Sequence, residues 1–342
     1  MKVCFFSHGS GTNQDGATLS MLNVMAELAN RDHEVIGIMA KDVNLEYMKK
    51  KKNVKFYFIP SYDMRLDLSR TGRKVELKYF VKNKLNWFIM QKTLKILRNE
   101  NIDIIHINGL NNGIGAMIAQ KLRIPYVWHI RQLMEEDLHQ RLYNQKKVWP
   151  MVKSANAVIA ISRAVKEKFE KEFNREIIVV YNGVPVEKYR IDNHSIFDEE
   201  LVKMVLPGRI VEGKGQLEAV KALKYLIDND IKNVKLILVG HKQSKYAQEV
   251  EAFVAKNDIA SYIEIQEHNA DLRSLRGICD IGLTCSVKEA FGRVTVENML
   301  AKMLVIGANT GGTLEIVEDG YNGLLYEEGN PESLAGRIEY AM

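Results

Sequence analysis

The sequence predicts an α/β protein made of two doubly wound, Rossmann-like domains. Short, nearly continuous apolar runs alternate with longer amphipathic segments, a pattern typical of parallel strands covered by helices on both faces. The alternation runs through once, pauses in the charged stretch 185–200 and then starts again. A chain of 342 residues is long enough for two domains of roughly 150 residues each. We therefore predict one domain over residues 1–188 and a second over residues 189–342.

The strands and helices follow from the same alternation. The strands expected in the first domain span residues 2–7, 34–39, 54–59, 103–107, 125–129, 157–160 and 177–180. Those expected in the second domain span residues 203–207, 234–239, 262–266, 280–283, 304–306 and 323–325. The main expected helices span residues 17–30, 74–99, 162–173, 214–228, 244–256 and 294–301. Ligands of such sheets bind in the crevice outside the carboxyl ends of the strands, so the loops there hold the candidate site residues.

The net charge of +5 conceals a difference between the two domains. Residues 1–190 carry 32 Lys and Arg against 19 Asp and Glu, whereas the remainder carries 16 against 24. The excess is concentrated in residues 41–98, with 16 basic against 5 acidic residues. This polarity indicates that the two halves meet different partners. No nucleic-acid-binding motif accompanies the charge, so we expect no nucleic acid among them.

Composition and cysteine usage indicate a soluble protein of the cytoplasm. Hydrophobic residues make up 46% and charged residues 27% of the chain, and no stretch approaches the ~20 apolar residues of a membrane span. The N-terminus is typical of a first strand rather than of a signal peptide. Cys4, Cys279 and Cys285 lack metal-ligand spacing and leave one cysteine unpaired in any disulfide scheme, which favours a reducing compartment.

The segment 288–323 is the richest in candidate site residues. Glu289-Ala290-Phe291-Gly292 forms a loop between a predicted strand and a predicted helix, where backbone amides and the helix dipole favour an anion. Gly292 lets the backbone approach a ligand closely. Glu297 follows about one turn into the helix. On spacing alone, the two carboxylates are as well explained by a capping residue and an exposed helix residue.

Three motifs in this segment resemble those of the retaining, family-4-type glycosyltransferases (glycosyl transferases group 1) of GT-B fold. The family pattern E-x-F-G-x-x-x-x-E, G-G-x-x-E and D-G-x-N-G stands here at 289–297, 311–315 and 319–323. The resemblance covers nearly the whole chain. It implies two Rossmann-like domains facing each other across a cleft, a nucleoside-diphosphate sugar as donor substrate and no cofactor. It also implies a role in bacterial cell-surface polysaccharide synthesis.

The resemblance assigns roles to individual residues. In such enzymes the first glutamate faces the donor sugar, which here is Glu289, and the second binds the ribose, which here is Glu297. The amides of the intervening loop hold the pyrophosphate, a role that falls to Phe291, Gly292, Arg293 and Val294. His129 ends a predicted strand and matches the family histidine that contacts the donor sugar. We therefore predict Glu289 and His129 as the catalytic residues, although a lone histidine is more often a packed or surface residue.

Arg209 and Lys214 match the family element G-R-x-x-x-x-K-G after the first strand of the second domain. The leaving nucleoside diphosphate gains negative charge as the glycosidic bond breaks, and a fixed Arg and Lys can stabilise that charge without a metal. A lysine at a helix N-terminus opposes the helix dipole, which favours a bound anion there. The other interpretation is two solvated cations. We expect no metal site, because Asp228–Asp230 ends a predicted helix and no other cluster has metal-ligand spacing.

The first domain carries an altered glycine-rich loop after its first strand. Gly9, Gly11 and Gly16 do not have the G-x-G-x-x-G spacing, so a dinucleotide site is weakly supported. The family has a loop here that closes over the diphosphate and the acceptor, so Gly16 is predicted to contact the donor. Thr18 stands where relatives often have glutamate. His106 also fits a family position, and we assign it a structural or acceptor-side role.

The sequence departs from the family pattern in the second domain as well. Lys302 and Leu304 stand where relatives have the Gly and Pro of a loop behind the sugar pocket. Residues 265–268 occupy the nucleobase region without the usual glycine. The chain stops at Met342, inside a helix expected from Pro331, whereas relatives continue with helices that cross back to the first domain. We therefore expect the second domain to be truncated at its crossing helix.

The stretch 65–98 predicts a partner for the basic domain. It interleaves basic and aromatic residues, namely Arg70, Arg73, Lys74, Lys78, Lys82 and Lys84 with Tyr79, Phe80, Trp87 and Phe88. A helix with a basic and an aromatic face suits an anionic bilayer surface. We therefore predict a peripheral position on the inner face of the cell membrane and a lipid-linked saccharide or glycan acceptor. In the alternative interpretation the aromatic residues enter the core and the lysines are simply solvated.

The predicted function is retaining glycosyl transfer, and two alternatives stay open. The first is epimerase or hydrolase chemistry on the same donor. A glycosidase needs two carboxylates about 5–10 Å apart across one bond, whereas Glu297 is assigned here to the ribose. The second is a nucleotide-sugar-binding subunit without activity, which the altered glycine loop keeps open.

Overall fold

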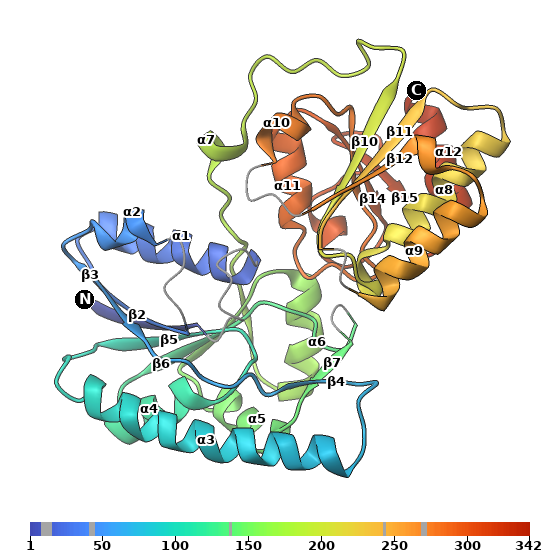
Figure 1. Ribbon diagram of the computed structural model, residues 1–342. Coiled ribbons are helices and arrows are strands. Elements are labelled where there is room, and N and C mark those ends of the chain that lie inside the picture. Colours follow the sequence, from blue (N-terminus) through green and yellow to red (C-terminus); the bar gives the residue numbers. More distant parts are fainter. Residues whose placement is uncertain (8–15, 41–44, 137–138, 242–243, 268–271) are drawn as a thin grey trace. The chain divides into compact units, whose positions relative to one another are not determined.

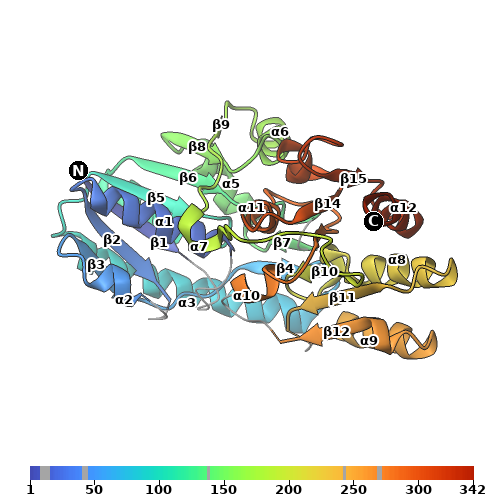
Figure 2. The same cartoon turned by 90° about the horizontal axis from the view of Figure 1, so that it is seen from above.

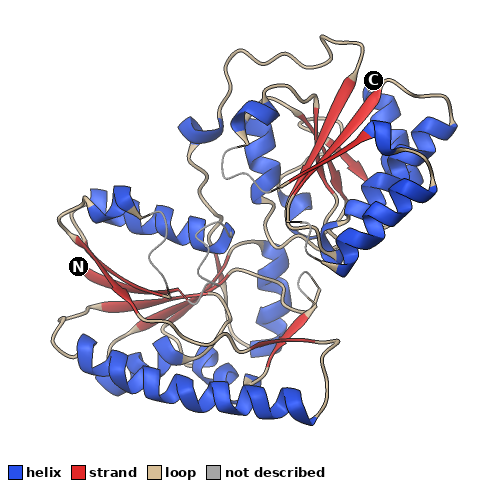
Figure 3. Ribbon diagram, viewed as in Figure 1, coloured by secondary structure: helices blue, strands red, loops and turns tan. Residues whose placement is uncertain are grey.

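The computed structural model describes residues 1–7, 16–40, 45–136, 139–241, 244–267 and 272–342 (Figure 1). It contains two compact units, Met1–Gly183 and Val184–Met342, whereas the predicted boundary lies after residue 188. Each unit has a parallel sheet between two layers of helices (Figure 3). The prediction of two Rossmann-like α/β domains is therefore confirmed.

The sheet of the first unit has seven parallel strands in the order β3-β2-β1-β5-β6-β8-β9. These strands are β1 (Lys2–Ser7), β2 (Glu34–Met39), β3 (Val54–Phe58), β5 (Ile104–Asn108), β6 (Tyr126–Ile130), β8 (Ala157–Ala160) and β9 (Ile178–Val179). The order reverses between β1 and β5, which is where doubly wound sheets bind their ligands. The segments that follow β5 and β6 therefore lie beside the ligand position of this unit.

Helices cover both faces of the first sheet. They are α1 (Gly16–Asn30), α2 (Glu46–Lys49), α3 (Arg73–Leu97), α4 (Ile114–Leu122), α5 (Gln145–Lys153) and α6 (Arg163–Phe173). Figure 1 shows α1 and α2 on one face and α3, α4 and α5 on the other. On the α1 side, Met21, Leu22 and Met25 pack against Val3 and Phe5 of the sheet. The long helix α3 contacts α4 and leaves much of its own surface to solvent.

The second unit has a parallel sheet of six strands in the order β12-β11-β10-β13-β14-β15. These strands are β10 (Val202–Pro207), β11 (Val234–Val239), β12 (Ile263–Gln266), β13 (Ile281–Thr284), β14 (Leu304–Ala308) and β15 (Leu324–Tyr326). The helices are α7 (Val186–Tyr189), α8 (Gln216–Asp228), α9 (Lys245–Lys256), α10 (Arg273–Arg276), α11 (Arg293–Leu300) and α12 (Pro331–Ala341). Figures 1 and 2 show α8, α9 and α12 on one face and α10 and α11 on the other. The strand order reverses between β10 and β13.

The central strands are buried because nearly every side chain along them is apolar. In β10 and β11, Met204, Leu206, Leu236 and Leu238 form one core with α8, α9 and α12, while Val205 packs on the opposite face. Cys285 lies in the first of these cores and Cys279 in the second, while Cys4 is buried on β1 of the first unit. Burial raises the pKa of Cys279 and Cys285 to about 12 and raises that of Cys4 further, so the three thiols stay protonated.

Several elements of the fold were not predicted from the sequence. An antiparallel pair joins β4 (Arg65–Asp67) to β7 (Gln140–Leu142), and both strands are too short for alternation to reveal them. The others are the helices α2, α4, α5, α7 and α10, of which α5 contains Pro150. Among the described residues, no helix is long and apolar enough to cross a membrane.

Candidate active site

Two loops of the second unit meet where its strand order reverses. One loop follows β10 and carries Lys214, and the other follows β13 and carries Glu289. They touch through their backbones, because a Cβ on Gly215 would lie 2.0 Å from the carbonyl oxygen of Cys285. Gly215 also has φ +71°, which favours glycine. Lys214 and Glu289 are therefore held side by side at the edge where doubly wound sheets bind ligands.

The carboxylate of Glu289 is the centre of this site. Its Oε2 accepts hydrogen bonds from Lys214 Nζ at 3.0 Å and from Ser286 Oγ at 2.7 Å. Burial alone would raise the pKa of Glu289, but the Lys214 ammonium and these hydrogen bonds outweigh it and hold the pKa below its usual value. Glu289 is therefore negatively charged at neutral pH.

Gly311 and Gly312, the two glycines of the G-G-x-x-E motif, pack against the backbone of the Glu289 loop. The Gly312 amide donates to the carbonyl oxygen of Glu289 at 2.7 Å, and a Cβ on Gly311 would lie 2.4 Å from the same oxygen. A Cβ on Gly312 would lie 2.7 Å from the Phe291 backbone. These contacts require glycine at both positions, and they explain why two motifs far apart in the sequence occur together.

Helix α11 begins directly after this loop. Gly292 caps it with φ +98°, so its first turn contains Arg293 and Val294, both half-buried. Phe291, just before the cap, is buried at 7% exposure. The start of α11 therefore lies next to Glu289, as the predicted pyrophosphate cradle requires.

Glu297 has partners that were not predicted. Its Oε2 accepts from Arg276 Nη2 at 2.7 Å, and its Oε1 accepts from Arg293 Nε at 2.8 Å. Arg293 Nη2 also donates to the hydroxyl of Tyr189 at 3.1 Å. Arg276 is fully buried, and its Nε donates to Asn298 Oδ1 at 2.9 Å. The ribose role of Glu297 stays a prediction, and a ribose would have to share this carboxylate with two arginines.

Arg209 and Gly16 stand apart from these contacts. Arg209 follows β10 and its side chain is exposed, which leaves the guanidinium able to meet a ligand. Gly16 is the exposed first residue of α1. The rest of the predicted glycine-rich loop, including Gly9 and Gly11, lies outside the described residues.

In the first unit, His129 belongs to a buried polar network at the end of β6. Its Nδ1 lies 3.2 Å from Arg131 Nη2 and 3.2 Å from His106 Nε2. An arginine only donates, so Nδ1 must carry the lone pair and the ring proton sits on Nε2. Burial first, then the charge of Arg131 and the proximity of His106, hold the pKa of His129 well below its ordinary value. His129 is therefore a neutral ring.

The proton on Nε2 makes His129 a hydrogen-bond donor rather than a base. His129 is buried at 5% exposure, and its Nε2 has no hydrogen-bond partner among the described residues. An unpaired buried donor is costly, so this atom is suited to a ligand oxygen. Arg131 is fixed in turn, since it donates to the side-chain oxygens of Asn108 and Asn182.

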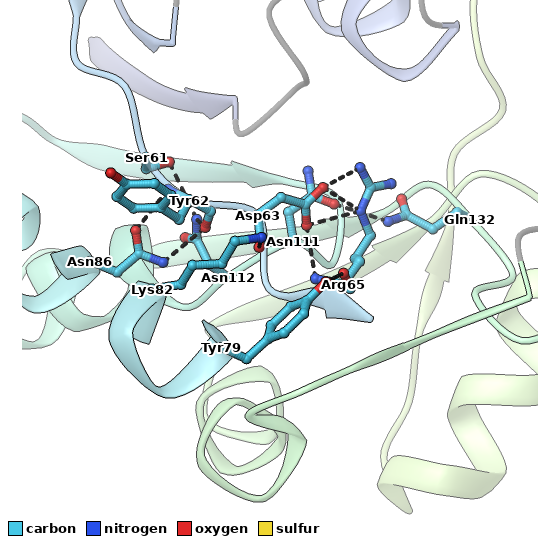
Figure 4. Close-up of polar contacts among 10 residues, drawn as sticks. All are labelled: Ser61, Tyr62, Asp63, Arg65, Tyr79, Lys82, Asn86, Asn111, Asn112 and Gln132. Atoms are coloured by element: carbon cyan, nitrogen blue, oxygen red, sulfur yellow. Dashed lines mark hydrogen bonds and ion pairs between the residues drawn. The ribbon is translucent and has the colours of Figure 1, made fainter. Parts of the chain in front are cut away.

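A second polar group lies on the same edge of the first sheet, and Figure 4 shows it. We call it the Asp63 cluster; its members are Ser61, Tyr62, Asp63, Arg65, Tyr79, Lys82, Asn86, Asn111, Asn112 and Gln132. Asn111 and Asn112 follow β5 and Gln132 follows β6, the strand that ends near His129. Gln132 Nε2 donates to Asn111 Oδ1 at 3.3 Å. Of these residues, only Lys82 and Tyr79 were given a role from the sequence, as a basic and an aromatic residue of the stretch 65–98.

Family profiles match both units. The profile described as Glycosyltransferase Family 4 matches residues 14–188, and that described as Glycosyl transferases group 1 matches residues 187–342. The chain belongs to these glycosyltransferases. The resemblance read from the three motifs is thereby confirmed.

Curated relatives carry the same family name. An uncharacterized glycosyltransferase of Methanocaldococcus jannaschii is 31% identical over 247 residues, which are 71% of this chain and 66% of that protein. CapM of Staphylococcus aureus, a capsular polysaccharide biosynthesis glycosyltransferase, is 26% identical over 248 residues, which are 68% of this chain and 64% of CapM. The matched part of this chain thus spans just under two thirds of the length of these relatives.

Solved glycosyltransferase structures share the fold. HepE of Anabaena, in complex with UDP and glucose, superposes with a TM-score of 0.77 at 22% identity, covering 100% of this chain and 89% of that chain. Sucrose-phosphate synthase of Thermosynechococcus elongatus gives a TM-score of 0.75 at 16% identity, covering 99% and 89%. The predicted GT-B fold is confirmed.

In this member of the family the predicted site residues form separate groups. Lys214 and Glu289 touch, Arg293 and Glu297 touch, and Arg209 lies on the loop that leads to Lys214. Sequence reasoning missed Ser286, Arg276 and Arg131, which hold Glu289, Glu297 and His129. Only Ser286 has a sequence signal, its place three residues before the motif glutamate. Within the described ranges no group of three or more His, Cys, Asp or Glu is arranged for a metal, and metal independence stays a prediction.

Proposed function

We propose that this glycosyltransferase moves a sugar from a nucleoside-diphosphate sugar to an acceptor, with retention of anomeric configuration and without a metal. The observation that carries the proposal is the contact of Glu289 with Lys214 and Ser286, between β10 and β13. A negative carboxylate at this point can stabilise positive charge that develops on the donor sugar. The neighbouring cation and the start of α11 can take the departing diphosphate.

The other predicted residues fit the same reaction. Arg209, exposed on the loop after β10, adds a second cation for the diphosphate. His129, with its proton on Nε2, donates a hydrogen bond to a sugar oxygen and does not act as a base. HepE was crystallised with UDP and glucose, and CapM is named for capsular polysaccharide synthesis, which supports a nucleotide sugar and a cell-surface glycan here. We propose a lipid-linked saccharide or glycan as acceptor.

A thermal-shift screen tests the donor class. We expect one nucleoside-diphosphate sugar to raise the unfolding temperature, because a ligand that binds only the native state stabilises it in proportion to occupancy. Incubation with that sugar and a glycan acceptor should give a product with the donor's anomeric configuration by NMR, also in the presence of EDTA. Inversion, or a strict requirement for a divalent metal, would contradict the mechanism. A donor that binds without turnover on any acceptor would favour the non-catalytic alternative.

We propose further that the first unit docks on the anionic inner face of the cell membrane through the outer face of α3. The helix carries seven Lys and Arg against one acidic residue. Leu77, Phe80 and Phe88 are exposed at 64%, 52% and 62%, and Val81, Leu85 and Trp87 are also exposed. Phe80, Trp87 and Phe88 therefore stay out of the core, unlike in the alternative interpretation. An outer face of aromatic and basic side chains suits a bilayer surface.

Liposome co-sedimentation tests the docking. Each basic residue near an anionic surface contributes about 1 kcal/mol, so replacing Lys74, Lys78 and Lys84 together by Gln should cost about 3 kcal/mol of binding free energy. We expect binding to vesicles that contain phosphatidylserine, weaker binding in high salt and none to neutral vesicles. As a control, Lys121, Lys146 and Lys153, which lie on α4 and α5, can be replaced by Gln instead. Equal loss in both triple variants, or binding that ignores lipid charge, would rule out docking through α3.

A further inference from the structure

Lys82 differs from the other lysines in the first half of α3. Lys74, Lys78 and Lys84 are exposed, whereas Lys82 is half-buried and belongs to the Asp63 cluster (Figure 4). Its Nζ lies 3.4 Å from the carbonyl oxygen of Asp63 and 4.4 Å from the centre of the Tyr79 ring. Within the described part of the chain, no carboxylate lies within ion-pair distance of this ammonium. Lys82 is thus a cation directed toward the sheet edge rather than toward solvent.

The surroundings of Lys82 are firmly held. Asn86 on α3 fixes the segment after β3 with two 2.8 Å bonds, accepting from the Tyr62 amide and donating to the Tyr62 carbonyl. The Met64 amide donates to the Asn111 carbonyl at 3.0 Å. The Tyr79 hydroxyl donates to the Arg65 carbonyl at 2.6 Å. Side chains around Lys82 therefore keep their positions before a ligand arrives, which lowers the cost of binding.

The charges of the cluster leave one positive charge in excess. Arg65 donates to both oxygens of Asp63, from Nε at 2.9 Å and 3.1 Å and from Nη2 at 2.5 Å. This bidentate pair neutralises the carboxylate. Burial first, and then Lys78, lowers the pKa of Lys82, while Asp63 opposes the shift. An anion bound at Lys82 would stabilise the charged ammonium and so oppose this lowering of its pKa.

We propose that Lys82, beside the Arg65–Asp63 ion pair, forms a subsite for a phosphate group of the acceptor. This inference rests on the proposed function and names the group by which the acceptor is held. The subsite lies on the edge of the first sheet where β5 and β6 end, the same edge as His129. Lys82 belongs to α3, whose opposite face is the proposed membrane surface. A phosphate that joins a lipid to a saccharide would be held here while the lipid stays in the bilayer.

Binding of geranyl diphosphate in solution tests the subsite without vesicles or sugar transfer. Titrations by calorimetry use the full chain in an Arg209→Ala background, so that the predicted diphosphate site of the second unit contributes little. We expect Lys82→Gln to weaken binding at least tenfold, the effect of losing a charge-assisted hydrogen bond. Lys82→Arg should retain most of the affinity. Lys92→Gln, at an exposed position of the same helix, should stay within twofold of its parent.

Three results would overturn the subsite. The first is that the Arg209→Ala protein does not bind geranyl diphosphate. The second is that Lys82→Gln binds it with the same affinity as that protein. The third is that geraniol, which lacks the diphosphate, binds as tightly as geranyl diphosphate. Unfolding temperatures show whether each variant is folded, and Lys82→Arg separates lost charge from a disturbed core. A failure of this subsite can be told apart from a failure of the proposed function. A protein that transfers sugar and docks on vesicles, yet binds geranyl diphosphate without Lys82, keeps the proposed function and loses this subsite.

Discussion

Replacing Glu289 by Gln should lower the turnover of glycosyl transfer by on the order of a hundredfold or more. Glutamine keeps the size and hydrogen-bonding reach of the side chain but removes the negative charge that would stabilise the donor sugar as its bond breaks. Binding of the free nucleoside diphosphate should change little, because Arg209, Lys214 and the start of α11 are intact. Steady-state kinetics and calorimetry with the diphosphate measure the two effects separately.

The matched control is Glu339→Gln, an exposed glutamate on α12 far along the chain from the site loops. It should transfer sugar at the rate of the unchanged protein. Near-normal transfer by Glu289→Gln would remove Glu289 from the mechanism. A parallel loss of diphosphate affinity would instead show that the carboxylate acts mainly by positioning Lys214, its partner at 3.0 Å.

Replacing Arg209 or Lys214 by Ala should weaken binding of the nucleoside diphosphate more than binding of the nucleoside. The expected difference is about 1.5–3 kcal/mol for each residue, the range of hydrogen bonds to charged groups. Arg209 gives the cleaner test because its side chain is exposed. Lys214→Ala also leaves Glu289 without its ion-pair partner. Burial then outweighs the remaining hydrogen bonds, so the pKa of Glu289 should rise.

Calorimetric titration with the two ligands measures this difference. The pH dependence of transfer provides a second readout, because a higher pKa of Glu289 in Lys214→Ala would shift the acidic limb of the profile to higher pH. The unchanged protein should keep its activity to lower pH, since its Glu289 stays ionised there. Equal losses for nucleoside and diphosphate would place both cations outside the leaving-group site.

The fold was predictable because its central strands are buried on both faces. Stretches such as Val234–Val239 are apolar nearly throughout, and the helix patterns between them are long enough to be unambiguous. The antiparallel pair β4–β7 was missed because three-residue strands carry no usable period. The inner and outer faces of α3 were also not separable by sequence, since Tyr79 enters the polar cluster while the adjacent Phe80 is exposed.

The candidate site was predictable where backbone geometry demands particular residues. Glycine is needed at positions 311 and 312 because the chain there passes within contact distance of the Glu289 loop. A requirement of this kind fixes the residue type, so it can be recognised as a sequence motif. Side chains that pair over a long sequence separation give no such motif. Arg276 reaches Glu297 from another helix, and Arg131 reaches Asn182 across 51 positions, so neither pairing could be read from spacing.

The burial of every cysteine has a practical consequence for work on this protein. Thiol reagents attack the thiolate, and buried thiols with raised pKa values supply almost none. A single cysteine introduced at an exposed position of α3, such as Phe88, would therefore take up a maleimide dye without removal of the native cysteines. The emission of an environment-sensitive dye at that position would report directly whether α3 enters an apolar phase.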